Sequence, residues 1–193
     1  MTDTVTKLAM LLTSAAMLTP GVLAQGFYVD GGYTALSYEG EIEEVEADLD
    51  FGALHLHAGY DFNSYIGIES EFLYGVNDED VTLFDEDIGD IDASVGLNYL
   101  VGVYGRAIWP VSDSFDLFAR AGWVQAELDA DATATVEGVT ESASISESDS
   151  GYAIGIGASW DMTDRFYLRA DYTRYTIDES DTDGVLIGAG FKF

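Results

Sequence analysis

Apolar residues alternate with small or polar residues through the last ten positions of the chain, Gly184 to Phe193. One face of such a strand would carry Val185, Ile187, Ala189, Phe191 and Phe193, and the other Leu186, Gly188, Gly190 and Lys192. An alternation of period two is typical of a β-strand whose two faces meet different surroundings. Strands of membrane barrels combine an apolar outer face with a small or polar inner face over about ten residues. The pattern therefore predicts a barrel strand in this segment.

The same alternation recurs along the chain. We predict strands at residues 27–38, 49–62, 65–74, 93–109, 115–126, 151–162, 166–176 and 184–193. Their connections alternate between short turns and long acidic loops, and the short turns near Asp61, Pro110 and Asp161 recur at intervals of about fifty residues, as in a repeat of hairpins. An even number of strands with short turns at one end and long loops at the other is typical of outer-membrane barrels. We therefore predict an all-β fold, an eight-stranded antiparallel up-and-down transmembrane β-barrel.

Aromatic residues gather near the ends of the predicted strands. Near the short turns lie Tyr60, Phe62, Tyr65, Trp109, Phe115, Trp160, Phe166 and Phe193, and towards the long loops lie Tyr74, Trp123, Tyr172 and Tyr175. Aromatic rings are enriched at both water interfaces of membrane barrels. The alternative is a soluble lipocalin-like barrel, in which the apolar faces would point inward and Glu69, Arg106, Arg120 and Arg169 would point outward. The aromatic distribution and the export signal described next favour the membrane barrel.

The first 24 residues have the organisation of an export signal. Lys7 precedes an apolar stretch from Leu8 to Leu18, and a Thr-Pro-Gly sequence then leads to Ala24. A positive start, a short apolar core and a small residue before the cut are the parts of a secretory signal peptide. We predict a signal peptide at residues 1–24, cleaved between Ala24 and Gln25, and a barrel domain at residues 25–193. The alternative for the first segment is a soluble amphipathic helix.

The composition narrows the range of partners. The 193 residues include 36 acidic and 7 basic residues, a formal net charge of −29, and no cysteine. Nucleic acid is excluded as a partner because binding its phosphates needs a basic surface. Hydrophobic residues make up 48% of the chain and aromatic residues 13%, which is too many for a disordered acidic protein. The absence of cysteine excludes a disulfide framework and thiolate metal sites.

Charged residues also occur at inward-facing strand positions. We predict an interior charge network of Glu69, Glu71, Arg106, Arg120, Arg169, Asp171 and Lys192. An eight-stranded barrel is just wide enough for side chains to fill its interior, and buried charges are tolerated only when they are paired and hydrogen-bonded. We expect these residues to plug the barrel, and the alternative is a narrow gated ion path.

The two histidines, His55 and His57, are two residues apart on one predicted strand and therefore point to the same side. Such a pair can bind a metal together with a nearby carboxylate, or one histidine can act as a general base. The sequence lacks an H-x-S-N arrangement that would indicate a barrel hydrolase. We interpret both histidines as polar residues of the lumen or its rim, and we predict neither catalysis nor a cofactor.

The predicted long loops contain many carboxylates and no lysine or arginine. Carboxylates on flexible loops can bind hard divalent cations weakly, on about the millimolar scale of low-affinity extracellular sites. Asp85, Glu86 and Asp87 form the best local cluster, and for this cluster we hypothesise weak Ca²⁺ or Mg²⁺ association. The alternative is an acidic rim that is only solvated and screened by salt.

Three stretches resemble a known family. The segments YDFNSYIGIESEF (residues 60–72), GYAIGIGASWDMTDRFYLRADYTRY (151–175) and GAGFKF (188–193) are similar to the eight-stranded outer-membrane β-barrel domain family, which includes the barrels of OmpA and OmpX. The resemblance covers residues 27 to 193. It implies a monomer in the outer membrane of the Gram-negative cell envelope, in contact with lipid and lipopolysaccharide.

The resemblance further implies that the barrel-assembly machinery recognises the C-terminal strand, with Phe191 and Phe193 as the assembly signal. We therefore expect a structural or surface-interaction role. The alternatives are a narrow porin-like ion channel and, less favoured, a lipid-modifying outer-membrane enzyme with a nucleophile beside His55 or His57.

Overall fold

The computed structural model describes residues 26–193, apart from residues 43–44, 77–78, 86–88, 137–138 and 179. The predicted signal peptide and its cleavage site between Ala24 and Gln25 lie outside the described residues. Among the described residues, no helix is long and apolar enough to cross a membrane.

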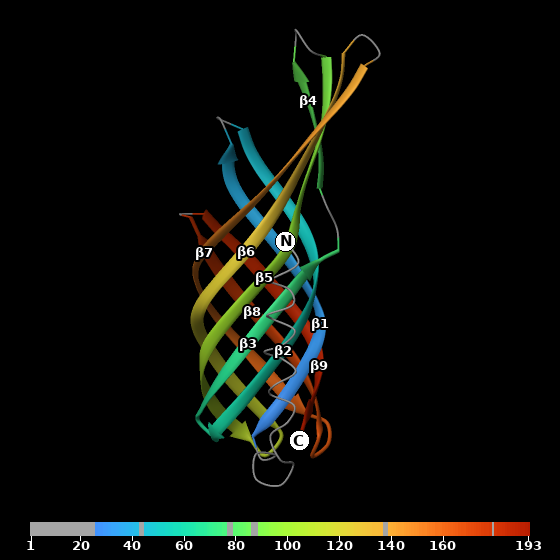
Figure 1. Cartoon of the computed structure of the whole chain (residues 1–193). Helices are drawn as coiled ribbons and strands as arrows, with labels where there is room; N and C mark the ends of the chain where they lie inside the picture. Colours follow the sequence, from blue (N-terminus) through green and yellow to red (C-terminus); the bar gives the residue numbers. More distant parts are fainter. Residues whose placement is uncertain (1–25, 43–44, 77–78, 86–88, 137–138, 179) are drawn as a thin grey trace, which may run out of the picture.

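Antiparallel strands make up almost all of the described chain and close into a cylinder (Figure 1). The strands are β1 (Phe27–Ile42), β2 (Val45–Asn63), β3 (Ile66–Gly75), β4 (Glu79–Asp85), β5 (Gly89–Ser112), β6 (Phe115–Val136), β7 (Val139–Asp161), β8 (Phe166–Ile177) and β9 (Ser180–Lys192). β1 pairs with β9 and thereby closes the sheet. β3 and β4 pair with successive parts of β5 and share one position in the wall. The predicted eight-stranded antiparallel up-and-down barrel is therefore confirmed.

The two faces of the strands separate as the alternation predicts. Buried and exposed residues alternate along most of β8 and β9. Large apolar side chains cover the outside, where Ile187 is 70% and Trp109 is 76% exposed, whereas Arg120 and Arg169 are each 2% exposed. A soluble lipocalin-like barrel would have the reverse arrangement, so that alternative is wrong.

β5 departs from the predicted alternation. Its pairing with β6 shifts between Leu97 and Tyr99, which marks a β-bulge. An extra residue in one strand changes the side to which the following residues point. Counted back from inward Arg106, the period-two alternation predicts that Leu97 faces outward and Asn98 inward, but Leu97 is buried and Asn98 is only half-buried. The prediction for these two residues was wrong because the sequence carries no clear signal for the bulge.

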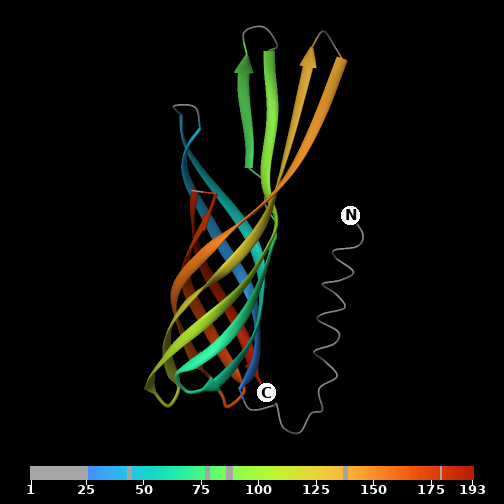
Figure 2. The ribbon, with the colours of Figure 1, turned by 60° about the vertical axis from the view of Figure 1, so that its left-hand side comes forward.

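The acidic segments predicted as long loops are instead largely β-hairpins. β1 reaches Ile42 before β2 begins at Val45, and β6 reaches Val136 before β7 begins at Val139. The β4–β5 and β6–β7 hairpins rise well beyond the barrel, at the end opposite the C-terminus (Figure 2). The acidic sequence still alternates in these segments, and antiparallel pairing satisfies the backbone hydrogen-bonding groups without an apolar core. The predicted loops at residues 39–48, 75–92 and 127–150 were therefore wrong in their secondary structure.

The predicted last loop, residues 177–183, is also shorter than expected. Ile177 at the end of β8 pairs with Ser180 at the start of β9. Asp178 in the connection has a φ of 48°, in the left-handed region that aspartate tolerates better than most residues. The β8–β9 connection is therefore a tight hairpin.

Two inward tyrosines lie over glycines of the neighbouring strand. Tyr28 is paired with Gly59, and Tyr167 is paired with Gly190. A Cβ atom at either glycine would come within 2.3 Å of the tyrosine ring. Glycine therefore leaves the room that lets each ring extend into the narrow lumen, where the two hydroxyl groups meet carboxylates.

Candidate functional site

Charged side chains from six strands meet inside the barrel, in the half that is nearer the short turns. This buried charge network consists of Asp30 on β1, His57 on β2, Glu69 and Glu71 on β3, Arg106 on β5, Arg120 on β6, and Arg169 and Asp171 on β8. Each member is at most 8% exposed. Every second residue of a strand points inward, so closure of the sheet brings together groups that are far apart in the sequence.

Arg120 makes contacts across the network. Its guanidinium donates to Glu69 Oε1 at 3.0 Å, to Glu71 Oε1 at 2.9 Å and to Asp171 Oδ1 at 3.2 Å. It also donates to the Thr173 hydroxyl at 3.1 and 2.7 Å. The planar fork of guanidinium donors suits several carboxylates at once, and Arg120 thereby links β6 to β3 and β8.

Glu69 contacts all three arginines of the network. Arg169 donates to its two oxygens at 2.6 and 3.0 Å, and Arg120 donates at 3.0 Å. The Nε atom of Arg106 lies 3.7 Å from Glu69 Oε2. Arg106 and Arg120 are directly opposite each other on β5 and β6, a placement that is destabilising for like charges. The Glu69 carboxylate offsets this repulsion.

Tyrosine hydroxyl groups occupy further oxygens of the buried carboxylates. Tyr28 donates to Glu69 at 2.6 Å, Tyr167 to Asp30 at 2.7 Å, Tyr175 to Glu71 at 3.1 Å, and Tyr104 also donates to Glu71. Hydrogen bonds to ionised acceptors are stronger than those between neutral groups. The network therefore combines charge pairing with a ring of hydroxyl donors.

His57 is held between two carboxylates. Its Nδ1 atom lies 2.7 Å from Asp30 Oδ1, and its Nε2 atom lies 2.9 Å from Glu71 Oε1. Ionised carboxylates only accept hydrogen bonds, so the ring donates to both only when both nitrogens carry a proton. His55 stacks on His57 with ring centroids 5.0 Å apart. The two histidines face inward, as their spacing predicts.

Six of the seven residues predicted for the interior network lie together in the structure: Glu69, Glu71, Arg106, Arg120, Arg169 and Asp171. Lys192 does not join them. Its ammonium group lies 2.6 Å from Asp161 at the short-turn end, and its side chain is 34% exposed. The prediction for Lys192 was wrong because the strand ends there, and its long side chain reaches the barrel mouth.

Sequence reasoning left Asp30, His57 and the four tyrosines out of the network. The alternation places Asp30 at an inward position of β1, so its burial could be predicted from the sequence, but the residues that it contacts could not. Those partners depend on the register between strands, since Asp30 is opposite His57 in the β1–β2 pair.

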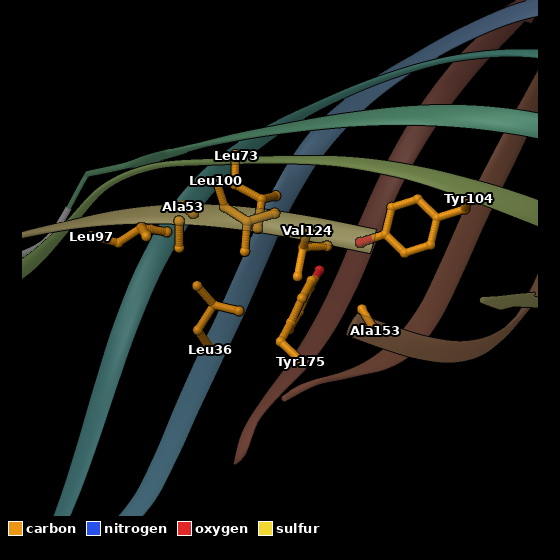
Figure 3. Packing of buried hydrophobic residues seen from close by; sticks show 10 residues of the cluster. Leu36, Ala53, Leu73, Leu97, Leu100, Tyr104, Val124, Ala153 and Tyr175 are labelled. Carbon is orange, nitrogen blue, oxygen red and sulfur yellow. The ribbon is translucent and has the colours of Figure 1, made fainter. Parts of the chain in front are cut away.

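An apolar cluster covers the network on the side of the long hairpins. Figure 3 shows this cluster, whose buried members are Leu36, Ala53, Leu73, Leu97, Leu100, Tyr104, Val124, Ala126, Ala153 and Tyr175. Leu73 follows Glu71 by two residues on β3, and Ala53 precedes His55 by two residues on β2. The lumen therefore changes from a charged layer to an apolar layer within about one step of the strand alternation.

A hollow of about 340 Å³ lies above the apolar cluster. Apolar residues such as Leu36, Phe51, Leu100 and Ile177 line it, together with polar rim residues that include Asp149. It lies at the end from which the long hairpins emerge. Tyr175 borders both this hollow and the charged network, since its hydroxyl donates to Glu71.

Most of the predicted interfacial aromatic residues are exposed on the outside. At the short-turn end, Tyr65, Trp109 and Phe166 are 66%, 76% and 57% exposed. Trp123, towards the hairpins, is 51% exposed. Tyr60 is half-buried. Tyr175 is 2% exposed and points into the lumen, so its predicted place in the outer aromatic belt was wrong.

Two further features lie at the hairpin end. Arg174 donates to both carboxylate oxygens of Asp183 at 2.7 Å, and these hydrogen bonds hold the pKa of Asp183 below its ordinary value. The hypothesised cation cluster falls at the connection between β4 and β5. Glu86, Asp87 and the side chain of Asp85 lie outside the described residues.

The fold and sequence both resemble known outer-membrane proteins. Residues 6–193 match the family model described as outer membrane protein beta-barrel domain. Among solved structures, the chain is similar to OprG of Pseudomonas aeruginosa, with 13% identity over 88% of this chain and 97% of OprG and a TM-score of 0.59. It is also similar to Ail of Yersinia pestis, with 18% identity over 88% of this chain and 99% of Ail and a TM-score of 0.57.

Neisserial surface protein A is a third similar structure, with 15% identity over 88% of this chain and 98% of that protein and a TM-score of 0.56. At these identities the structural likeness establishes the fold alone. No curated protein matches the sequence. The family model nevertheless spans almost the whole chain, and the closed barrel with its apolar exterior agrees with it. The chain belongs to the outer membrane protein β-barrel domain family and is located in the outer membrane.

Proposed function

We propose that this protein is a structural, surface-interacting barrel that conducts no ions and catalyses no reaction. The observation that supports this proposal is the complete burial of charged side chains in the lumen. The side chains of Asp30, Glu69, Glu71 and Arg120 are 0% exposed, and their polar atoms are paired within the barrel. An ion path needs a continuous series of wet polar sites, and an apolar constriction opposes it by excluding water.

The apolar cluster strengthens this argument because it lies in series with the charged layer. Leu73 and Val124 are 0% exposed, and Leu36 and Leu100 are 4% exposed. An ion crossing the barrel would have to displace both layers. The charged layer would lose its pairing, which is costly for buried groups.

The surroundings of the histidines support a non-catalytic role. The Thr34 hydroxyl lies 3.2 Å from His55 Nδ1, a distance at which a nucleophile and a base can interact. Thr34 is 1% and His55 is 4% exposed. A lipid substrate needs access to its nucleophile, and neither residue is open to the outside of the barrel.

The hairpin end supplies the surface for interaction. We propose that its partners are cationic, or that divalent cations bridge them to the carboxylates. Ail is known in complex with the heparin analogue sucrose octasulfate. The acidic segments of this chain contain no lysine or arginine, so a polysulfate would meet repulsion here. Opposite charge steers association, and like charge suppresses it.

Lipid and lipopolysaccharide are proposed as the partners of the barrel wall. A groove of about 710 Å³ on the outer surface is lined mainly by small and apolar residues, including Ala107, Ala119, Ala158 and Ala170. Such a groove suits acyl chains. We further propose a monomer whose C-terminal strand is recognised by the barrel-assembly machinery through Phe191 and Phe193. The rings of these two residues are 5.1 Å apart on the outer side.

Planar bilayer recording tests the central claim. The refolded protein should give no conductance steps above bare lipid, while a general porin inserted into the same membrane gives clear steps. Discrete steps from this protein that scale with its amount would contradict the proposal and favour the narrow channel. The surface role is tested separately on a heparin resin at physiological salt. We expect no retention, and retention there would contradict the proposed charge preference.

A further inference from the structure

We propose that Asp30, His55 and His57 form a site for one divalent transition-metal ion inside the barrel, with Zn²⁺ as the natural probe. This inference goes beyond the proposed structural role and does not depend on it. One potential ligand atom of each residue lies within 4.8 Å of the other two. These atoms are Asp30 Oδ1, His55 Nε2 and His57 Nδ1, and all three side chains are 0% exposed.

His55 supplies the observation that points to a ligand. Its Nε2 atom is buried and has no hydrogen-bond partner, although it is aimed towards Asp30 Oδ1 at a distance of 3.6 Å. A buried polar atom without a partner is uncommon and destabilising. A metal ion between Nε2 and the carboxylate would satisfy this nitrogen.

Two glycines leave space around the His55 ring. A Cβ atom at Gly188 on β9 would come within 2.7 Å of His55 Nε2, and one at Gly32 on β1 would come within 2.8 Å of His55 Cε1. Any larger residue at either position would press against the edge of the ring that carries the unpartnered nitrogen. The lack of both side chains thus leaves the room that the His55 ring occupies beside Asp30.

Each proposed ligand already has an outer partner that fixes its orientation. His55 Nδ1 lies 3.2 Å from the Thr34 hydroxyl, and His57 Nε2 lies 2.9 Å from Glu71 Oε1. The Tyr167 hydroxyl donates to Asp30 Oδ2 at 2.7 Å, on the oxygen that does not face the histidines. Metal-binding histidines almost always donate their second ring N–H to an outer acceptor, and bound carboxylates are likewise hydrogen-bonded.

The charge balance also favours a cation at this position. The buried charge network contains four carboxylates and three guanidinium groups, so it lacks one positive charge. A cation bound beside Asp30 would supply positive charge to this group of buried carboxylates.

The ligand types indicate the class of metal. Imidazole suits Zn²⁺, Cu²⁺, Ni²⁺ and iron, whereas Ca²⁺ and Mg²⁺ prefer all-oxygen sites. Zn²⁺ binds histidine nitrogen and carboxylate oxygen at about 2.0–2.2 Å in tetrahedral geometry, so its ligand atoms lie roughly 3.3 Å apart. The Asp30–His57 distance of 2.7 Å and the Asp30–His55 distance of 3.6 Å lie on either side of this value. Small side-chain rotations would therefore accommodate the ion.

The test uses the full chain refolded in detergent with ZnCl₂ present, so that entry into the buried site does not limit binding. After a wash with a weak chelator and gel filtration, we expect one Zn²⁺ per folded chain by elemental analysis. With Co²⁺, we expect visible absorption bands that Zn²⁺ abolishes and Mg²⁺ leaves unchanged. Absence of stoichiometric metal in the folded wild-type protein would overturn the proposal.

His55→Gln is the decisive variant, because it removes Nε2, the proposed ligand atom, which makes no hydrogen bond in the protein without metal. It also removes the Nδ1 contact with Thr34, so we expect a modestly lower melting temperature than that of the metal-free wild type and a loss of at least about 100-fold in Zn²⁺ affinity. Thr34→Val should lose less, within the roughly 10–100-fold range typical of an outer partner. The control combines Asp85→Asn, Glu86→Gln and Asp87→Asn, and it should bind Zn²⁺ like the wild type. Unchanged affinity in the folded His55→Gln variant, or loss of binding in the control, would refute the site.

Discussion

Arg120→Ala is the sharpest test of the interior arrangement. The substitution removes the donor that serves Glu69, Glu71 and Asp171 at 3.0, 2.9 and 3.2 Å. The three carboxylates stay buried, and the network is left with four carboxylates and two guanidinium groups in place of three. Breaking a buried ion pair by removing one partner costs about 3–5 kcal/mol. We expect the free energy of unfolding to fall by that amount.

The remaining contacts explain why the loss should not be larger. Arg169 still donates to Glu69 at 2.6 Å and to Asp171 at 2.7 Å. His57 lies 2.9 Å from Glu71. Each stranded carboxylate therefore keeps a hydrogen-bonding partner, so the barrel should still fold at reduced stability.

Arg165→Ala is the matched control, since it removes the same side chain from an exposed turn. The guanidinium carbon of Arg165 is 6.0 Å from the centroid of the Phe191 ring, and exposed charge contacts contribute about 0–1 kcal/mol. Both variants are unfolded with urea in detergent micelles and followed by tryptophan fluorescence. The Arg120→Met variant separates the effect of lost charge from that of lost volume, because methionine fills much of the space of the arginine side chain. We expect it to be nearly as unstable as the alanine variant. Equal stabilities for Arg120→Ala and Arg165→Ala would refute the inside–outside assignment.

Three further outcomes are expected. The folded protein in detergent should give a β-rich circular dichroism spectrum and migrate faster unboiled than boiled on a denaturing gel, whereas a helical spectrum would contradict the barrel. Arg174 holds the pKa of Asp183 below its ordinary value, so this pair stabilises the fold above the pKa of the unfolded chain and the effect is lost as pH falls through the lowered folded value. Arg174→Ala should raise the pKa of Asp183 towards its ordinary value, and a carboxyl NMR titration that finds no change would contradict this. Calorimetric titration of Ca²⁺ should give binding heat that persists at an ionic strength matched with NaCl. This heat should be lost when Asp85, Glu86 and Asp87 are neutralised. If matched NaCl abolishes the heat, Ca²⁺ only screens the acidic charges.

The sequence alone determined the barrel and the side to which most residues point. Period-two alternation is a local property of each strand, and a membrane exterior requires apolar residues on one face. Val185 and Ile187 could therefore be placed outside, and Arg120 and Arg169 inside, without knowing any contact. The same reasoning placed both histidines in the lumen.

The length of the hairpins was decided by strand pairing rather than by residue polarity. Residues 130–136 alternate alanine or valine with aspartate or threonine, a pattern that suits a strand as well as a solvated loop. Backbone hydrogen bonds with β7 resolve this ambiguity. The bulge at Leu97 is likewise a property of the β5–β6 pair, because it exists only where one strand carries an extra residue relative to its partner.

The chemistry of the interior depended on the register and on closure. Asp30 lies opposite His57, and Gly32 lies opposite His55, only because β1 and β2 pair in this register. Closure of β1 on β9 then brings Gly188 against the His55 ring. A shift of one residue would turn every inward side chain outward. The sequence therefore determined which residues enter the lumen, and the tertiary structure decided which of them meet, because contacts across a barrel depend on the relative heights of strands that are distant in the chain.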